Sequence, residues 1–383
     1  MENWKEYKLE DISKSIFAGG DASKFPCKKY KTDIYSIPMY ANAIENDGLY
    51  GYTNTAIVHE PAVTIAARGA GTGNVIYRNK PFTPIVRLIS IIPNNNVNPL
   101  FLACILQLKK LSGDGSAIPQ LTVPEVKKMS IKLPSLNTQN RVANFIEKLN
   151  QKIALNRRIN GNLEQQAQAL FKAWFVDFEP FKSGKFVDSE LGRIPEGWKV
   201  VELGKATTQE KEKVGIRSDV KVLSPVTTGK LMLSEEYFTK QVFSDSIAKY
   251  ILVKPNSFAY NPARVNIGSM GRNTFMFDGC VSPVYVVFSC EKEYHYFFDM
   301  YRQLPSFKEE VIARSIGGVR QTLKYSDFAL IQIIYPPQNV VIQFNDLYER
   351  LLYAQNMFHA ESKNLAEIRD SLLPQLMSGE INM

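Results

Sequence analysis

The sequence predicts a mixed α+β protein in which one plan is used twice, a globular α/β domain followed by a long helix. The chain has 383 residues, of which 45% are hydrophobic and 22% charged, and this length suits two globular cores with connecting segments. Short motifs recur at offsets of 194 and 202 residues. Each copy of the second motif leads into a run with helical periodicity, so the repeat covers both domains and helices.

The ends of the two domains carry the repeat. Trp4-Lys-Glu-Tyr-Lys-Leu9 reappears as Trp198-Lys-Val-Val-Glu-Leu203, and Ile131-Lys-Leu-Pro134 reappears as Ile333-Ile-Tyr-Pro336. A looser echo links the segment at 115–122 to the segment at 317–323. The interiors of the domains otherwise diverge. We therefore expect the two domains to share the structure of their ends and to differ in the segments between.

Each repeated Pro is followed by an apolar seam in alternating steps of four and three residues, which is typical of a coiled coil. The first seam is Val142, Ile146, Leu149, Ile153, Asn156, Asn160, Leu163, Ala167, Leu170 and Trp174. The second is Phe344, Tyr348, Leu351, Gln355, Phe358, Ser362, Leu365, Arg369 and Leu372. We expect the helices to pack through large apolar members, namely Ile146, Leu149, Ile153, Leu163, Leu170, Trp174, Tyr348, Leu351, Phe358, Leu365 and Leu372.

Chain order predicts that the two helices are antiparallel. The first helix leads from the first domain to the second, and the second helix has to return along it, which gives a pseudo-two-fold internal repeat. The predicted segments are domain 1 at 1–136, helix 1 at 137–181, a linker at 182–197, domain 2 at 198–338 and helix 2 at 339–383. Within the domains we expect strands at Ala62–Ala66, Ile85–Ile92 and Val281–Phe288, and short helices near Pro99–Lys110 and Tyr294–Gln303.

Charge favours a nucleic-acid partner. The net charge is +8, with +5 in residues 1–135 and +3 in residues 183–335, so both domains are basic. The helical segments carry +3 at 136–182 and −3 at 336–383, which suits their pairing. The four cysteines form no CxxC pair and there are three histidines, so we expect no metal or cofactor site. Without a signal-like or membrane-spanning run, a cytoplasmic protein is expected.

Four segments carry a family resemblance. They are Ile194-Pro-Glu-Gly-Trp198, Leu170-Phe-Lys-Ala-Trp-Phe-Val-Asp-Phe-Glu-Pro180, the junction of Pro134 with the first helix, and Leu372-Leu-Pro-Gln-Leu-Met-Ser-Gly-Glu-Ile381. In this order they resemble the specificity (S) subunits of type I restriction–modification systems. The resemblance covers the whole chain, with each domain in the place of a target-recognition domain and each helix in the place of a conserved helix.

The resemblance implies a non-catalytic subunit whose target-recognition domains each read one half of a split site in double-stranded DNA. It also implies that the helices bind two modification (methyltransferase) subunits, which hold S-adenosylmethionine, and that restriction subunits join the complex. It implies no cofactor for this chain and no membrane partner.

Base reading needs donor and acceptor side chains, and phosphate binding needs cations and backbone amides. Two loops at related places in the domains combine such residues with glycine, and a later loop in each domain adds a second set. The predicted DNA-binding residues are Arg68, Thr72, Asn74, Arg78 and Gln120 in domain 1, and Asn261, Arg264, Asn266, Ser269, Arg272, Arg320, Gln321 and Lys324 in domain 2.

Three other functions remain open on the sequence. A self-contained DNA methyltransferase would need a Gly-rich cofactor loop and a Pro-Pro-aromatic catalytic loop, which Gly69-Ala-Gly-Thr-Gly73 and Tyr260-Asn-Pro-Ala263 match only in part. A coiled-coil adaptor without DNA binding would show no affinity for DNA at any salt concentration. A stand-alone transcription regulator is disfavoured because no helix-turn-helix signature is evident.

Overall fold

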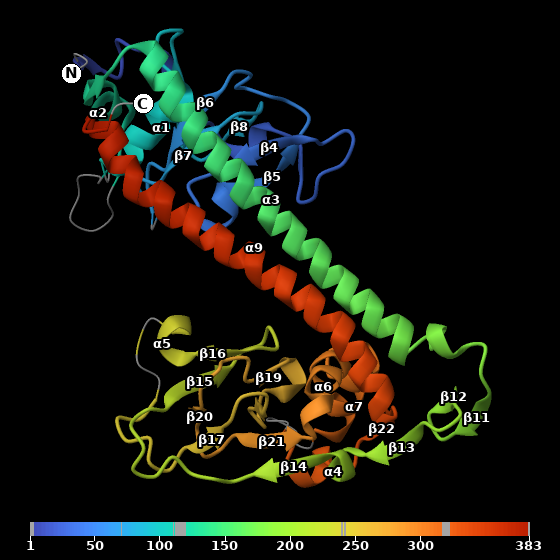
Figure 1. Ribbon diagram of the computed structural model, residues 1–383. Coiled ribbons are helices and arrows are strands. Elements are labelled where there is room, and N and C mark those ends of the chain that lie inside the picture. Colours follow the sequence, from blue (N-terminus) through green and yellow to red (C-terminus); the bar gives the residue numbers. More distant parts are fainter. Residues whose placement is uncertain are drawn as a thin grey trace. The chain divides into compact units, whose positions relative to one another are not determined.

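The computed structural model describes residues 4–69, 71–109, 111, 120–238, 240, 243–315 and 322–381. The chain divides into two compact units. Unit 1 comprises Met1–Arg158 and Phe358–Met383, and unit 2 comprises Ile159–Met357. Each unit contains strands and short helices together with part of both long helices (Figure 1). The predicted mixed α/β class with two domains is confirmed.

Among its described residues, unit 1 holds ten strands and two short α-helices. The strands are β1 (Lys5–Lys8), β2 (Ser13–Ala18), β3 (Cys27–Lys28), β4 (Ile37–Tyr40), β5 (Leu49–Thr53), β6 (Ala62–Ile65), β7 (Val75–Arg78), β8 (Thr83–Pro84), β9 (Ile89–Pro93) and β10 (Ser130–Leu133). The helices are α1 (Pro99–Leu108) and α2 (Val123–Lys128), with 3-10 turns η1 (Ala22–Lys24) and η2 (Glu45–Gly48).

Two four-stranded sheets build unit 1. Their orders are β2-β9-β6-β7 and β3-β5-β4-β8. Helix α1 begins after Asn98, whose side chain accepts hydrogen bonds from the backbone amides of Leu100 and Phe101, and Pro99 suits the first helical position. Its apolar face, including Phe101 and Leu102, packs into one core with residues of β6, β7, β9 and the last turn of α9.

Unit 2 holds the remaining strands. They are β11 (Phe186–Ser189), β12 (Gly192–Pro195), β13 (Lys199–Glu202), β14 (Thr207–Glu210), β15 (Lys221–Pro225), β16 (Leu231–Leu233), β17 (Ile251–Val253), β18 (Phe258–Tyr260), β19 (Met270–Arg272), β20 (Gly279–Val281), β21 (Val286–Cys290) and β22 (Gln332–Tyr335). Its short helices are α4 (Leu203–Ala206), α5 (Ser234–Tyr237), α6 (His295–Tyr301), α7 (Pro305–Arg314) and α8 (Tyr325–Phe328), with 3-10 turns η3 (Glu179–Phe181), η4 (Val265–Ile267) and η5 (Lys292–Tyr294).

The sheets of unit 2 repeat those of unit 1 in outline. One has the order β14-β21-β18-β19, with the same strand succession as β2-β9-β6-β7, and the other has the order β16-β15-β20-β17. Helices α6 and α7 lie beside the first sheet (Figure 1). Phe297 and Phe307 of these helices share a core with Phe258 and Phe288 of the sheet.

The repeated end motifs pair with each other inside each unit. Strand β1 pairs antiparallel with β10, and Lys5 lies opposite Leu133. Strand β13 pairs antiparallel with β22, and Lys199 lies opposite Tyr335. The offsets of 194 and 202 residues between the motifs therefore preserve one register, so the first and last strands of each unit close it in the same way.

The long helices are α3 (Leu136–Phe175) and α9 (Gln338–Ser378), which begin within one residue of the predicted starts. Every residue of both predicted seams is buried or half-buried, including all the large apolar members expected to pack there. Within unit 1, Asn150 contacts Arg369 and Asn156 contacts Glu361. The later residue on α3, Asn156, contacts the earlier residue on α9, Glu361. These parts of the helices are therefore antiparallel, as predicted.

Two of the expected strands are shorter than the apolar runs that suggested them. In the run from Ile85 to Ile92 the strand starts at Ile89, because Val86 and Arg87 form a turn with φ of 51° and 60°. In the run from Val281 to Phe288 the chain turns at Ser282–Tyr285, where Pro283 lacks a backbone donor. A continuous apolar run cannot by itself reveal such an interruption.

The segment expected to be a linker has regular structure. Strands β11 and β12 form an antiparallel hairpin, with Phe186 opposite Pro195. Ile194 is 2% exposed and Phe186 is half-buried, and both contact the unit 2 core around Trp198. In the part of the chain that the structure describes, no helix combines the length and apolar character required to span a membrane.

Candidate nucleic-acid interface

The first candidate loop joins β6 to β7 as a hairpin. The backbone amide of Ala66 donates to the carbonyl of Asn74 over 2.9 Å, and the amide of Gly73 donates to the carbonyl of Ala66 over 2.9 Å. Gly73 has a φ of 84°, and a Cβ there would lie 1.8 Å from the carbonyl oxygen of Leu111. Glycine is therefore required by both conformation and space.

The later loop of domain 1 meets this hairpin. The amide of Leu121 donates to the carbonyl of Ala67 over 2.8 Å, and Arg68 and Gln120 form a β-bridge. Thr122 then caps α2 through a capping box with Glu125. The two candidate sets of domain 1, far apart in sequence, thus come together at one edge, although residues 112–119 of the later loop lie outside the described part of the chain.

Unit 2 repeats this arrangement with other residues. The loop between β18 and β19 is closed by hydrogen bonds from the amide of Asn261 to the carbonyl of Ser269 (3.1 Å) and from the amide of Ser269 to the carbonyl of Arg264 (3.2 Å). The amide of Leu323 donates to the carbonyl of Pro262 over 3.1 Å, which matches the bond made by Leu121. Lys324 follows directly, whereas the predicted Arg320 and Gln321 lie outside the described residues.

The predicted DNA-binding residues differ in exposure. Side chains at the surface of the two edges are those best able to contact DNA, and these are Arg68, Gln120, Arg264 and Lys324. Half-buried are Thr72, Asn74, Asn261 and Asn266. Ser269 is 2% exposed, and Arg78 and Arg272 are 7% and 8% exposed. A part of the predicted set therefore lies beneath the surface.

Arg78 is held inside unit 1. Its Nε donates to Thr64 Oγ1 over 3.1 Å and its Nη2 donates to the carbonyl of Asp47 over 2.6 Å. The guanidinium carbon also lies 3.6 Å from the centre of the Tyr40 ring, within the range of a cation–π contact. These contacts engage Nε and Nη2 and hold the guanidinium beneath the surface, so the structure gives Arg78 a supporting position.

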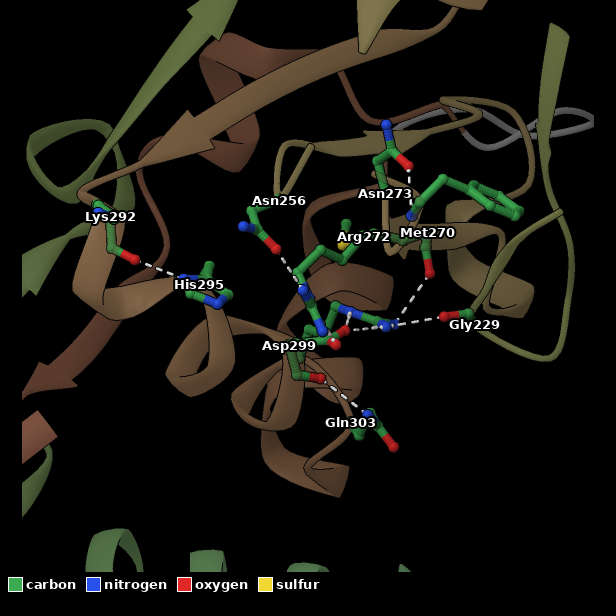
Figure 2. A network of polar contacts seen from close by, with 11 residues as sticks. Gly229, Asn256, Met270, Arg272, Asn273, Lys292, His295, Asp299 and Gln303 are labelled. Carbon is green, nitrogen blue, oxygen red and sulfur yellow. Dashed lines mark hydrogen bonds and ion pairs between the residues drawn. The ribbon is translucent and has the colours of Figure 1, made fainter. Parts of the chain in front are cut away.

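Arg272 has the matching position in unit 2 and belongs to a larger network. Arg78 lies opposite Ala62 in its hairpin, and Arg272 lies opposite Phe258. Arg272 Nε donates to Asp299 over 2.9 Å (Figure 2). Arg302 contacts the same carboxylate. Burial by itself raises the pKa of Asp299, but the two arginines outweigh it and hold the pKa below the ordinary value. Asp299 is therefore an ionised partner of two cations.

Sequence reasoning missed Asp299 and Arg302. Neither belongs to a motif, because the segment at Tyr294–Gln303 was expected only as a short helix. The repeat offers one sequence signal for the buried role of Arg78 and Arg272. Arg78 and Arg272 are 194 residues apart, the offset of the Trp4 and Trp198 motifs, so a repeated arginine at a strand end could have been assigned to the frame.

The helices meet around a polar layer. Asn156 is 0% exposed, and its Nδ2 donates to Glu361 Oε2 over 2.7 Å, while its Oδ1 has no hydrogen-bond partner. Lys152 Nζ lies 3.2 Å from the same carboxylate. The hydrogen bonds from Asn156 and Lys152 lower the pKa of Glu361. A buried polar seam residue with an unpaired oxygen weakens packing and fixes register.

Asn156→Leu is expected to raise the free energy of unfolding by about 1 kcal/mol, because removal of the unpaired buried oxygen outweighs the loss of the hydrogen bond to Glu361, whose side chain is 42% exposed, and Leu keeps the branching of Asn. The pKa of Glu361 should move up toward 4.5. Since a lowered pKa gives stability above pH 4.5 that is lost on acidification, the variant should also be less sensitive to acid in that range. Urea unfolding at neutral and acid pH, with NMR titration of Glu361, measures both effects. Unchanged titration would contradict the hydrogen bond.

The partial matches to enzyme loops have other roles in the fold. A cofactor loop of a methyltransferase joins a strand to a helix, whereas the loop at Gly69–Gly73 and the loop that begins at Asn261 each join antiparallel strands. Among the described residues, no group of three or more His, Cys, Asp and Glu is placed to hold a metal ion. Burial raises the pKa of Cys104 to about 11 and that of Cys280 to about 12, so both thiols are protonated at neutral pH.

Comparison with known proteins decides the family. Residues 1–165 match the model of the type I restriction modification DNA specificity domain. The chain is 27% identical over 417 residues to the type I restriction enzyme MjaIX specificity subunit of Methanocaldococcus jannaschii, covering 100% of this chain and 94% of that protein. It is 37% identical over 98 residues to the C-terminal part of the Mycoplasma pneumoniae type I specificity subunit S.MpnORF289P, covering 26% of this chain and 67% of the relative. The chain belongs to the type I restriction–modification specificity subunits.

Further relatives of the specificity subunit extend over its full length. The HindI specificity subunit of Haemophilus influenzae is 26% identical over 463 residues, with 100% of both chains covered. The crystal structure of the S subunit of a type I restriction–modification system from M. genitalium matches with a TM-score of 0.61 and 13% identity, covering 98% of this chain and 96% of that one. At this identity the structural match concerns the fold, and it agrees with the predicted architecture of the specificity subunit.

Proposed function

We propose that this specificity subunit binds a bipartite site in double-stranded DNA, with one target-recognition domain on each half. The observation that carries the proposal is that both units form the same kind of surface edge, in which a hairpin loop meets a second loop. In each unit a hairpin loop meets the segment before a short helix, through the bonds of Leu121 to Ala67 and of Leu323 to Pro262. The backbone hydrogen bonds match in the two units, whereas the exposed side chains differ. This suits two domains that read different sequences.

The domain assignment that accompanies this proposal keeps target-recognition domains at 1–136 and 198–338. Each domain is followed by a segment, 137–181 or 339–383, most of which is one long helix, α3 (Leu136–Phe175) or α9 (Gln338–Ser378). We propose that the helices bind two modification subunits, which carry S-adenosylmethionine and perform methyl transfer, and that restriction subunits join them. The specificity subunit itself supplies DNA recognition and no catalytic group. The loop after β6 connects two antiparallel strands, whereas a methyltransferase cofactor loop joins a strand to a helix, and this supports the division of tasks.

Methylation mapping tests the proposal. In cells without other modification systems, the specificity subunit expressed with its modification subunit should produce one split methylated motif, and either subunit alone should produce none. Methyl transfer by the specificity subunit alone would show that it is an enzyme. If the pair binds no DNA at any salt concentration, the adaptor function is the correct one.

Arg264→Ala should weaken DNA binding and reduce the slope of log K against log salt by about 1, since an exposed arginine at the edge contributes about one phosphate contact. Lys182→Ala is a matched control, because Lys182 is exposed after α3 and paired with Glu179. Its slope should equal that of the wild type. Equal slopes for all three proteins would remove Arg264 from the interface.

A further inference from the structure

The tight turn between β15 and β16 lies against the β18–β19 hairpin of unit 2, the hairpin that is proposed to read DNA. In the turn, the amide of Gly229 donates to the carbonyl of Val226 over 3.0 Å, and the amide of Val226 donates to the carbonyl of Lys230 over 3.0 Å. Thr227, Thr228 and Lys230 are exposed. We call residues 227–230 the threonine loop. It presents two hydroxyl groups and one cation at the surface.

The backbones of the threonine loop and the hairpin are in direct contact. A Cβ on Gly268 would lie 2.7 Å from the carbonyl oxygen of Thr227, and a Cβ on Gly271 would lie 2.5 Å from the amide nitrogen of Leu231. Gly268 also has a φ of 95°, a conformation that suits glycine. Only glycine allows this approach, so the two segments form one surface.

Arg302 ties the two segments together. Its Nη1 donates to the carbonyl of Met270 in β19 over 2.9 Å, and its Nη2 donates to the carbonyl of Gly229 in the threonine loop over 2.8 Å. Figure 2 shows the carbonyls of Gly229 and Met270 converging on one side of the network, with Asp299 and Arg272 beside them. The Arg302 side chain is 10% exposed, so it acts from beneath the surface.

In unit 1, different residues connect the corresponding turn to the hairpin. Its corresponding turn joins β4 to β5, and Arg78 donates to the carbonyl of Asp47 in this turn over 2.6 Å. The side chain of Asn42, in the same turn, accepts a hydrogen bond from the amide of Ala67 at the hairpin over 2.8 Å. In both units, therefore, a buried arginine holds a turn beside the hairpin proposed to read DNA.

The threonine loop and the hairpin also border one cavity. It has a volume of about 340 Å³, and its lining includes Thr227, Asn266, Gln303 and Lys308 together with the apolar Phe307. Polar and cationic side chains from the threonine loop, the hairpin, the segment after α6 and helix α7 thus surround one opening. Such a combination suits contacts with base edges and phosphates.

We infer that the threonine loop reads DNA together with the hairpin, and that Arg302 is the positioning residue that holds the two segments in register. This inference rests on the proposed function and adds a recognition segment to it. Thr227 and Thr228 contact base edges through hydroxyl groups that can donate or accept, and Lys230 contacts a phosphate. Arg302 touches no DNA and acts through the carbonyls of Gly229 and Met270.

The test compares the methylated motif of the wild type with that of Thr227→Ala/Thr228→Ala, each expressed with the modification subunit. Domain exchange first assigns each half-site to its unit. The variant should lose base preference at one or more positions of the unit 2 half and bind that site at least tenfold more weakly, while the unit 1 half stays unchanged. Thr208→Ala is the matched control, because Thr208 is exposed on β14, at the opposite edge of the sheet from β19.

Arg302→Ala and Arg78→Ala form a reciprocal pair. Arg302→Ala should relax the unit 2 half alone, and Arg78→Ala the unit 1 half alone, with Arg302→Lys recovering part of the preference because it keeps a cation beside Asp299. A merely structural role would lower total methylation and leave the motif as it is. If the wild type gives no split motif, the proposed function is wrong. If it gives one and the threonine variant retains it with affinity within twofold, the inference about the threonine loop is overturned.

Discussion

Phe171→Ala should lower the free energy of unfolding of unit 2 by about 3–5 kcal/mol, the usual loss when a fully buried phenylalanine is truncated. Phe171 is 2% exposed in α3, and its ring centre lies 5.8 Å from those of Phe297 in α6 and Phe344 in α9. One side chain therefore joins both long helices to the sheet-bearing part of unit 2. Urea unfolding followed by hydrogen exchange of unit 2 amides measures the effect.

The control for this variant is Tyr353→Ala, which truncates an aromatic residue that is 68% exposed on α9. Its effect should stay within about 0.5 kcal/mol, as is usual for surface positions. A loss below about 1 kcal/mol for Phe171→Ala would mean that the helices and the sheet of unit 2 unfold independently of this aromatic cluster.

A matched insertion of seven residues in both long helices should lengthen the spacer between the half-sites by about three base pairs, without altering either half. Seven residues add about 10.5 Å to a helix, and one base pair occupies about 3.4 Å of duplex. The insertion points are next to Asn160 in α3 and Gln355 in α9, which contact each other across the helices of unit 2. A full heptad keeps each seam on its own face.

Methylation mapping of the insertion variant reads spacer and half-sites together. Insertion into α3 alone is the control, since it shifts one seam past its partner by two turns and should abolish methylation. An unchanged spacer in the double insertion would show that the helices do not set the distance between half-sites. A change in the half-site sequences would show that the helices take part in base reading.

The long helices could be predicted closely because their signals are local and repeated. Pro134 and Pro336 mark where strands end, and the four-three steps that follow place one face of each helix in the interior. Both helices begin within a residue of the predicted starts and no seam residue is exposed, but α3 ends at Phe175 and not at the predicted 181. Periodicity that continues along most of each helix outweighs a local disturbance such as Gly161.

The interiors of the domains were less predictable, because their structure depends on contacts between distant segments. The turn at Val86–Arg87 exists because its amides bond to the carbonyls of Gly20 and Gly19 near the end of β2. The arginines at strand ends could be recognised as donors, but whether such a donor faces DNA or a carboxylate depends on its neighbours. For Arg272 that neighbour is Asp299, supplied by a helix 27 residues away.

The two domains share sequence motifs at their ends and differ in between. The pairing of β1 with β10 and of β13 with β22 explains why the end motifs are shared. Each domain starts and finishes on the same ladder, with Lys5 opposite Leu133 and Lys199 opposite Tyr335. The residues between the paired strands differ from one domain to the other, while the strand pair that closes each domain has the same register. Exchange of the residues between the paired strands would therefore leave the closing ladder and the long helices of the chain unchanged.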